Sequence, residues 1–209
     1  KRGYTYVAIT DHSKSLGVAG GLSDDDLLRH AEEIRALGAK YPDIRVLAGT
    51  EADIRQDGTL DYPDELLAKL DFVVASIHSG FKQDRETLTG RVVRAMQNPY
   101  ARVIAHPTGR LLGDRDPYEL NFDEIMKEAV RTKTCLEVNS NFHRLDLNDL
   151  HCRKAREMGV HVIISTDSHN YDDLLNLPYG VATAQRGWIE KDRVLNARPV
   201  EDMLSFKTK

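Results

Sequence analysis

The sequence predicts an α/β fold in which parallel strands, joined by crossover helices, form a closed or nearly closed barrel. Three observations support this prediction. Short β-branched runs alternate with helical patterns along the chain, which is typical of repeated βα units. The runs are almost continuously apolar, as buried parallel strands are. A polar or metal-ligating side chain follows each run, at the end of the strand where β/α barrels place their active sites.

Six strands are expected, each bounded by polar or turn-forming residues. In chain order they are Tyr4–Thr10, Arg45–Gly49, Phe72–Ile77, Arg102–Ala105, Thr134–Val138 and His161–Ser165. The segments between them carry helical patterns. Ser23 and Asp26 form a capping-box pattern at the start of the first helix, and Gly38 is placed to end it. Further helices are expected at Asp64–Leu70, Arg91–Gln97, Phe122–Arg131 and Asp149–Met158, and one or two closing helices are expected from Lys191 onward, around Pro199.

Composition bounds the class of protein. The chain has 209 residues, 41% of them hydrophobic and 30% charged, and no repeat or linker divides it, so we expect one domain over 1–209. The net charge of −4 argues against a broad basic surface for nucleic acid but leaves a local site open. Two cysteines are too few for a disulfide framework, and no signal peptide or membrane-spanning run is recognised. These features predict a cytoplasmic protein without a membrane partner.

The residues at the strand ends predict a metal site. Six of them are metal-ligating types, and we expect His12, Glu51, His78, His106, Asp167 and His169 to be ligands. A mixed nitrogen and oxygen set suits Zn, Mn or Fe, and more than four ligands imply more than one ion. Such a pair of ions can activate water for attack on a phosphoester. The ligand types alone leave amidohydrolase chemistry open as well.

Other polar residues give weaker signals. The candidates for substrate binding are Lys82, Arg110, Asn139, Asn141 and Arg144. The basic side chains could each hold a phosphate or simply be solvated, and the asparagines could equally form turns. Asp11 could orient a ligating histidine or belong to a turn. We assign the acidic run at 24–26 to a helix start, and the other four histidines to structural positions.

Several motifs then resemble a known superfamily. They are Thr10-Asp11-His12, Gly49-Thr50-Glu51, Ser76-Ile77-His78, Ala105-His106-Pro107 and Ser165-Thr166-Asp167-Ser168-His169. In this order they resemble the polymerase and histidinol phosphatase (PHP) superfamily, whose fold is a distorted seven-stranded β/α barrel. A second set of segments is similar to the carboxy-terminal PHP domain of bacterial family-X DNA polymerases. These segments are 9–16, Val18–Leu22, His106–Arg110, Gly187-Trp188 and Val194–Asn196.

The resemblance implies a metal-dependent phosphoesterase with two or three ions, acting as a 3'-to-5' exonuclease on DNA 3' ends in repair, beside a linked polymerase module. It implies that Glu51 bridges two ions, with Asp167 at one of them. It also implies that His78 and His106 complete the coordination of the second ion, and that His12 and His169 coordinate a third. The implied nucleophile is a hydroxide that bridges the ions, so that Glu51, Asp167 and His12 count as catalytic residues.

One departure and two alternatives accompany this resemblance. Members of the superfamily begin with a strand that ends in His-x-His followed by Ser-Asp-Gly, and this sequence has no such motif. We therefore expect a barrel that lacks its first strand, in a chain that is either a fragment of a longer polymerase or a variant without this strand. The alternatives are a small-molecule phosphatase of the histidinol-phosphate type and a non-catalytic module that supports a polymerase.

Overall fold

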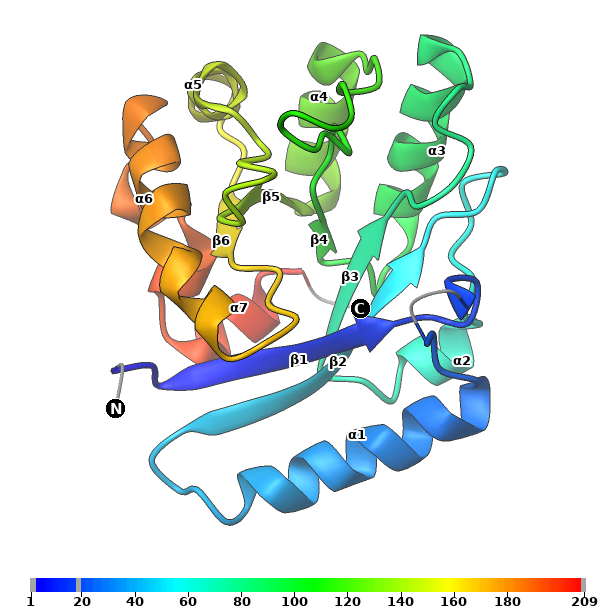
Figure 1. The fold of residues 1–209 in the computed structure, drawn as a ribbon, viewed down its shortest axis with the longest axis vertical. Coiled ribbons are helices and arrows are strands. Elements are labelled where there is room, and N and C mark those ends of the chain that lie inside the picture. The colour runs from blue at the N-terminus through cyan, green and yellow to red at the C-terminus, as the bar shows by residue number, and fades with distance from the viewer. Residues whose placement is uncertain (1–2, 18–19, 208–209) are drawn as a thin grey trace.

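The structure is a computed structural model that describes residues 3–17 and 20–207. Val18 and Ala19, part of one family-like segment, lie outside the described residues. Six parallel strands form one sheet in the order β1-β2-β3-β4-β5-β6, so every strand pairs with its neighbour in the chain (Figure 1). The strands are β1 (Tyr6–His12), β2 (Arg45–Asp53), β3 (Phe72–Ser76), β4 (Val103–Ile104), β5 (Cys135–Asn139) and β6 (Val162–Ser165). All six predicted strands are therefore present.

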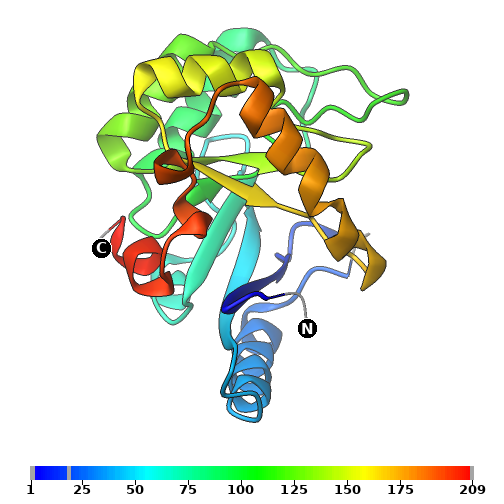
Figure 2. The same ribbon diagram turned by 90° about the vertical axis from the view of Figure 1, so that its left-hand side faces the viewer.

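Among the described residues, five helices connect consecutive strands and lie outside the curled sheet, and two more follow the last strand (Figures 1 and 2). They are α1 (Asp24–Gly38), α2 (Asp64–Leu67), α3 (Arg85–Gln97), α4 (Phe122–Thr132), α5 (Asp149–Met158), α6 (Leu177–Arg186) and α7 (Val200–Ser205). Short 3-10 turns lie at η2 (Asp172–Asn176), η3 (Lys191–Arg193) and η4 (Leu195–Ala197). The side chain of Ser23 accepts a hydrogen bond from the Asp26 amide, which confirms the predicted N-cap of α1.

Three helices differ from the prediction. Helix α3 begins six residues before the predicted start, at an N-cap formed by Asp84, because the side chain of Asp84 accepts from the Thr87 amide. Helix α2 ends at Leu67 rather than Leu70. Helix α6 is an element that was not predicted, although its first turn contains a proline, a residue that favours helix starts.

Alternation along the strands separates two apolar layers. On β2, Ala48 and Ala52 face outward and pack with residues of the surrounding helices in the main core. Leu47 faces the inside and packs with Phe72, Val103 and other residues in a smaller inner cluster. The C-terminal segment contributes Leu195 and Met203 to this inner cluster. Glu51 shares the inward face with Leu47, four residues along the same strand, so the inner apolar layer lies beneath the polar strand ends.

The sheet is curled but not closed. Among the described residues, no ladder joins β1 to β6 (Figure 2). Residues of both strands line one cavity of about 700 Å³. Six parallel strands in an open, curled sheet confirm the predicted distorted PHP-type barrel with one strand fewer than seven. In the part of the chain that is described, no helix is both long and apolar enough to cross a membrane.

Candidate metal centre

The carboxyl ends of five strands bring the six predicted ligands into one cluster. The ring centroid of His12 lies 5.2 Å from that of His78 and 5.9 Å from that of His169. The rings of His78 and His106 lie 5.5 Å apart. Nδ1 of His169 is 3.8 Å from Oδ1 of Asp167. This convergence follows from the parallel topology, since every strand delivers its last side chains to the same edge of the sheet.

Glu51 lies at the centre of the cluster. Its Oε1 atom is 3.0 Å from Nε2 of His106 and 3.3 Å from Nε2 of His78. Its Oε2 atom is 3.7 Å from Nδ1 of His12. The hydroxyl of Ser76 also donates to Oε1, at 2.7 Å. One carboxylate therefore contacts histidines from three different strand ends, as a bridging ligand must.

Two of the predicted ligands have left-handed backbone conformations. His106 has φ of 28° and Asp167 has φ of 48°. Residues other than glycine seldom adopt a positive φ, and those that do concentrate at functional sites. Strand alternation alone would direct His106 away from the interior, because Ala105 precedes it on the inner face. The left-handed turn changes that direction and lets His106 reach Glu51.

The carboxylates make this pocket favourable for positive charge. Burial on its own lowers the pKa of His78, but hydrogen bonds to Asp53 and Glu51 outweigh burial and raise the pKa to about 9. The pKa of His106 is also raised, by its bond to Glu51 against the effect of burial. Burial raises the pKa of Glu51, yet the bonds from His106 and His78 dominate and hold it well below its usual range.

These features fit a divalent cation. Donor atoms of His12, Glu51 and His78 all lie within 4.8 Å of one another, close enough for one ion to be shared among them. Nδ1 of His12 and Nδ1 of His106 are buried and have no hydrogen-bond partner among the described residues, so both are available for another ligand. A cation could replace the protons that the histidines take up, since metal binding requires neutral imidazole.

Two buried acids that were not among the predicted site residues lie beside the cluster. Asp53 follows Glu51 by two residues on the same face of β2, and its Oδ1 lies 3.4 Å from Nδ1 of His78. Carboxylates in this position commonly orient a metal-ligating histidine. Glu137, in the middle of β5, accepts hydrogen bonds from the His106 amide and from Asn139. A lone acid within an apolar strand was the sequence signal for Glu137.

The predicted substrate-binding residues separate into different environments. Arg144 reaches the cluster, with its Nε 3.0 Å from Oδ2 of Asp167, and its buried Nη1 has no hydrogen-bond partner among the described residues. Arg110 instead donates to the backbone carbonyls of Arg144 and Leu145. Lys82 is exposed on the loop before α3. Phosphate binding by these residues stays a prediction.

The asparagines and Asp11 make structural contacts. The Asn139 amide nitrogen donates to Glu137 and to Asp167, at 3.2 and 3.0 Å. Oδ1 of Asn141 accepts from the His143 amide, which is the turn geometry left open by the sequence. Oδ2 of Asp11 lies 2.9 Å from Nε2 of His30, so Asp11 ties β1 to α1.

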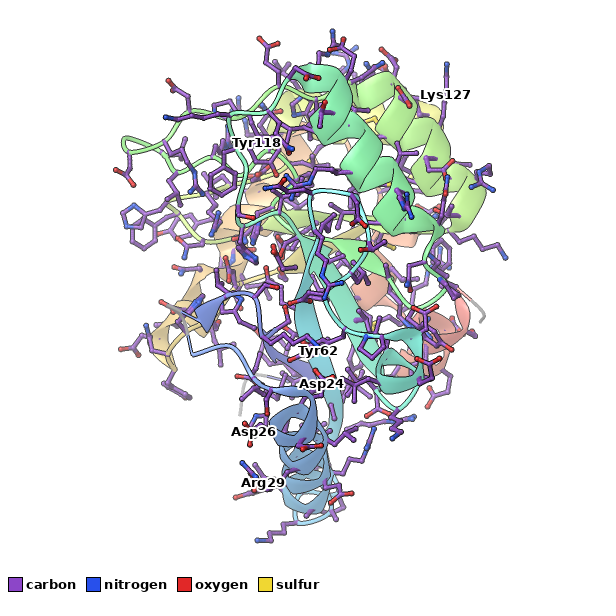
Figure 3. All side chains as sticks on the ribbon, turned by 90° about the vertical axis from the view of Figure 1, so that its right-hand side faces the viewer. Asp24, Asp26, Arg29, Tyr62, Tyr118 and Lys127 are labelled. Carbon is purple, nitrogen blue, oxygen red and sulfur yellow. The ribbon has the colours of Figure 1, made fainter. Side chains whose placement is uncertain are left out.

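The acidic run at the start of α1 is a helix start, as predicted. Asp26 accepts from the hydroxyl of Ser23 and pairs with Arg29, and Asp24 pairs with Lys14 at 2.7 Å. Figure 3 shows Asp24, Asp26 and Arg29 together at this end of α1. Negative charge in a first turn is favourable because the helix dipole is positive there.

Comparison with known proteins gives relatives of two kinds. The chain is 48% identical over 206 residues to the DNA polymerase/3'-5' exonuclease PolX of Bacillus subtilis, a match that covers 99% of this chain and 36% of that protein. It is 26% identical over 206 residues to a probable phosphatase of Thermoanaerobacter sp., covering 94% of the chain and 79% of the relative. It is also 29% identical over 186 residues to a probable phosphatase of Caldicellulosiruptor bescii, covering 83% and 71%. A scan against models of protein families finds no match.

The chain thus spans about a third of the length of the PolX protein that it matches. The match to PolX covers almost the whole chain, and the curled parallel sheet is the fold that the resemblance implies. Together they confirm the predicted resemblance to the PHP superfamily, in which this chain is similar to the PHP domain of bacterial family-X DNA polymerases.

Proposed function

We propose that residues 1–209 are the phosphoesterase domain of a longer polymerase chain and that this domain removes nucleotides from DNA 3' ends in a metal-dependent reaction. The observation that carries the proposal is the contact of one buried carboxylate, Glu51, with three histidines from separate strand ends. The relatives named as probable phosphatases support hydrolysis of a phosphoester. The relative named as a polymerase and 3'-5' exonuclease supports DNA as the substrate and a polymerase module as the linked partner.

Two to three divalent ions, Mn or Zn with Fe as a further candidate, fit the donor set, and the six predicted ligands are the residues that would hold them. When bound, such ions supply activation of water and neutralise charge on the phosphate. The carboxylates of Glu51 and Asp167 balance the charge of these ions. His12, His78, His106 and His169 offer neutral nitrogen donors once their protons have left.

The protein residues also supply orientation. Asp53 holds His78 at two points. Its Oδ1 atom accepts from the backbone amide of His78 at 3.1 Å and lies 3.4 Å from Nδ1 of the His78 ring. Arg144 lies against Asp167 with one nitrogen free of a partner within the described residues, and this nitrogen is suited to a phosphate oxygen. A guanidinium in this position would draw the scissile phosphate toward the cluster.

A second candidate function is hydrolysis of a small phosphate monoester. The relatives named as probable phosphatases, which this chain covers over most of their length, favour it. The chemistry at the cluster is the same for both substrates, so the size of the substrate separates the two functions. A non-catalytic role beside a polymerase remains the third candidate.

The test incubates the chain with a single-stranded oligonucleotide labelled at its 5' end and with Mn²⁺, and resolves the products at single-nucleotide steps. We expect a ladder that shortens from the 3' end, lost in Glu51→Gln and kept in His30→Ala. His30 is a suitable control because it contacts a carboxylate outside the cluster. An intact oligonucleotide beside rapid hydrolysis of a small monoester would favour the second function. Inactivity on both substrates, repeated with the longer polymerase protein, would leave the non-catalytic role.

A further inference from the structure

Glu137 is a buried acid to which the proposed reaction assigns no role. It lies in the middle of β5, the strand between β4 and β6 in the sheet, and is only 6% exposed. Alternation places it on the inner face with Cys135 and Asn139. Its carboxylate accepts from three donors, which come from three adjacent strands: the His106 amide, the Ser165 hydroxyl and the Asn139 amide nitrogen.

The first of these bonds supports the left-handed turn at His106. The amide of His106 donates to Oε2 of Glu137 instead of to a strand carbonyl. A residue at φ of 28° has left the strand conformation, so its amide needs a different acceptor in the interior. Glu137 supplies that acceptor at the point where the side chain of His106 turns toward Glu51.

The second connection reaches the other left-handed residue of the cluster. The amide nitrogen of Asn139 lies 3.2 Å from Oε2 of Glu137 and 3.0 Å from Oδ2 of Asp167, and so bridges the two carboxylates. The hydroxyl of Ser165 donates to Oε1 of Glu137 from β6, two residues before Asp167. Glu137 is therefore in contact with the end of β4 and the end of β6 at once.

We propose that Glu137 is a positioning residue that fixes the relative placement of His106 and Asp167, and thereby the spacing of two metal positions. The proposal rests on the proposed function for its metal site. In this proposal the hydrogen bonds of the carboxylate hold metal ligands in place, whereas a buried acid that served stability alone would not affect metal affinity. Carboxylates that hold metal ligands in place typically contribute 10- to 100-fold to metal affinity.

The substitution Glu137→Gln separates hydrogen bonding from charge. A glutamine oxygen at the Oε2 position can accept from both His106 and Asn139. Its amide nitrogen, at the Oε1 position, can donate to the Ser165 hydroxyl, which rotates to accept. Glu137→Ala removes all three bonds. Asp71→Asn is the matched control, because Asp71 also accepts from a strand amide, that of Ala48, but lies before the amino end of β3, away from the cluster.

Two measurements test the proposal on the whole chain: calorimetric titration of the metal-free protein with Mn²⁺, and amide hydrogen exchange in segments 104–108 and 165–169. We expect Glu137→Ala to weaken Mn²⁺ binding by roughly 10- to 100-fold and to speed exchange in both segments. We expect Glu137→Gln to restore both properties and Asp71→Asn to change neither. Unchanged Mn²⁺ affinity in Glu137→Ala, or equal damage from the glutamine variant or the control, would overturn the proposal.

Two further outcomes remain decisive. If Glu137→Ala does not fold, Asn139→Ala decides, because it removes the bridge between Glu137 and Asp167 but keeps the bond from the His106 amide to Glu137. The variant also loses the bond from the Asn141 amide, which lies outside both measured segments. Faster exchange at 165–169 with 104–108 unchanged is then expected, and a uniform change would refute the coupling. If the native chain binds no Mn²⁺, the proposed function fails, and the exchange data alone decide whether Glu137 positions both segments.

Discussion

Nε2 of His106 lies 3.0 Å from Oε1 of Glu51, and both side chains are almost completely buried. An isolated buried carboxylate is costly, and here the charge of Glu51 is offset by His78, whose pKa is raised to about 9, and by its hydrogen bond with His106. The same arrangement is suited to receive a metal ion, which carries more positive charge than a proton. The balance of charge around Glu51 therefore underlies the first prediction.

Metal ions should stabilise the folded chain through Glu51. We expect Mn²⁺ at about 100 times its dissociation constant to add about 2.7 kcal/mol to the free energy of unfolding, because only the folded state presents the converged ligands. Thermal unfolding with and without Mn²⁺, with a chelator as reference, measures this effect. Glu51→Gln should abolish most of the shift and His30→Ala should retain it. The prediction is contradicted if Glu51→Gln responds to Mn²⁺ as strongly as the native chain does.

Removal of the His78 ring should abolish hydrolysis while the fold persists. The ring contacts Glu51 and Asp53 and forms no part of the apolar core, so His78→Ala should lower turnover by about 100-fold or more and leave the chain folded. Its Tm should fall, because two buried carboxylates lose a positively charged partner. The assay measures turnover of the labelled oligonucleotide over a range of Mn²⁺ concentrations. Retained turnover at saturating Mn²⁺ would show that His78 is not a ligand.

The two arginines predicted to bind phosphate should behave differently. Arg144→Ala should raise KM more than it lowers kcat, because Arg144 contacts Asp167 through Nε and keeps Nη1, unpartnered among the described residues, to bind substrate before the chemical step. Arg110→Ala should instead lower the free energy of unfolding by about 1–3 kcal/mol, since it leaves carbonyls of the 144–145 loop without donors. Steady-state kinetics and urea unfolding of both variants distinguish these effects. A dominant fall in kcat for Arg144→Ala would place that residue in transition-state stabilisation.

Sequence patterns sufficed for the strands and for the six clustered residues, because in a parallel sheet the position of a residue at a strand end already fixes its place in space. They did not suffice for Glu137 or Asp53. The roles of these acids depend on hydrogen bonds to His106 and His78, residues that are distant in the sequence. The direction of His106 was equally hidden, since it depends on a left-handed backbone that no neighbouring glycine announces. Helix α6 was missed although its sequence carries helix-start signals, an asparagine at the N-cap and a proline in the first turn.

Stability should fall in mild acid because of His151. This histidine stacks on Phe122 with ring centroids 3.8 Å apart, and burial lowers its pKa to about 4, with the positive charges of Lys154 and Arg110 adding to the effect. The unfolded chain, whose histidines titrate near 6.5, then takes up a proton first as pH falls. The contribution of His151 is therefore fully present above pH 6.5 and is lost progressively as pH falls toward 4.

The size of this loss follows from the partial exposure of the ring. After a discount for solvent screening, the effect amounts to about 1–2 kcal/mol. Urea unfolding of the native chain and of His151→Gln at pH 7.5 and pH 5 measures it. Because the clustered histidines titrate in both proteins, the difference between their pH dependences isolates His151. We expect the variant to lose less stability between the two pH values, and an identical loss in both proteins would show that the His151 ring is protonated as readily in the folded chain as in the unfolded one.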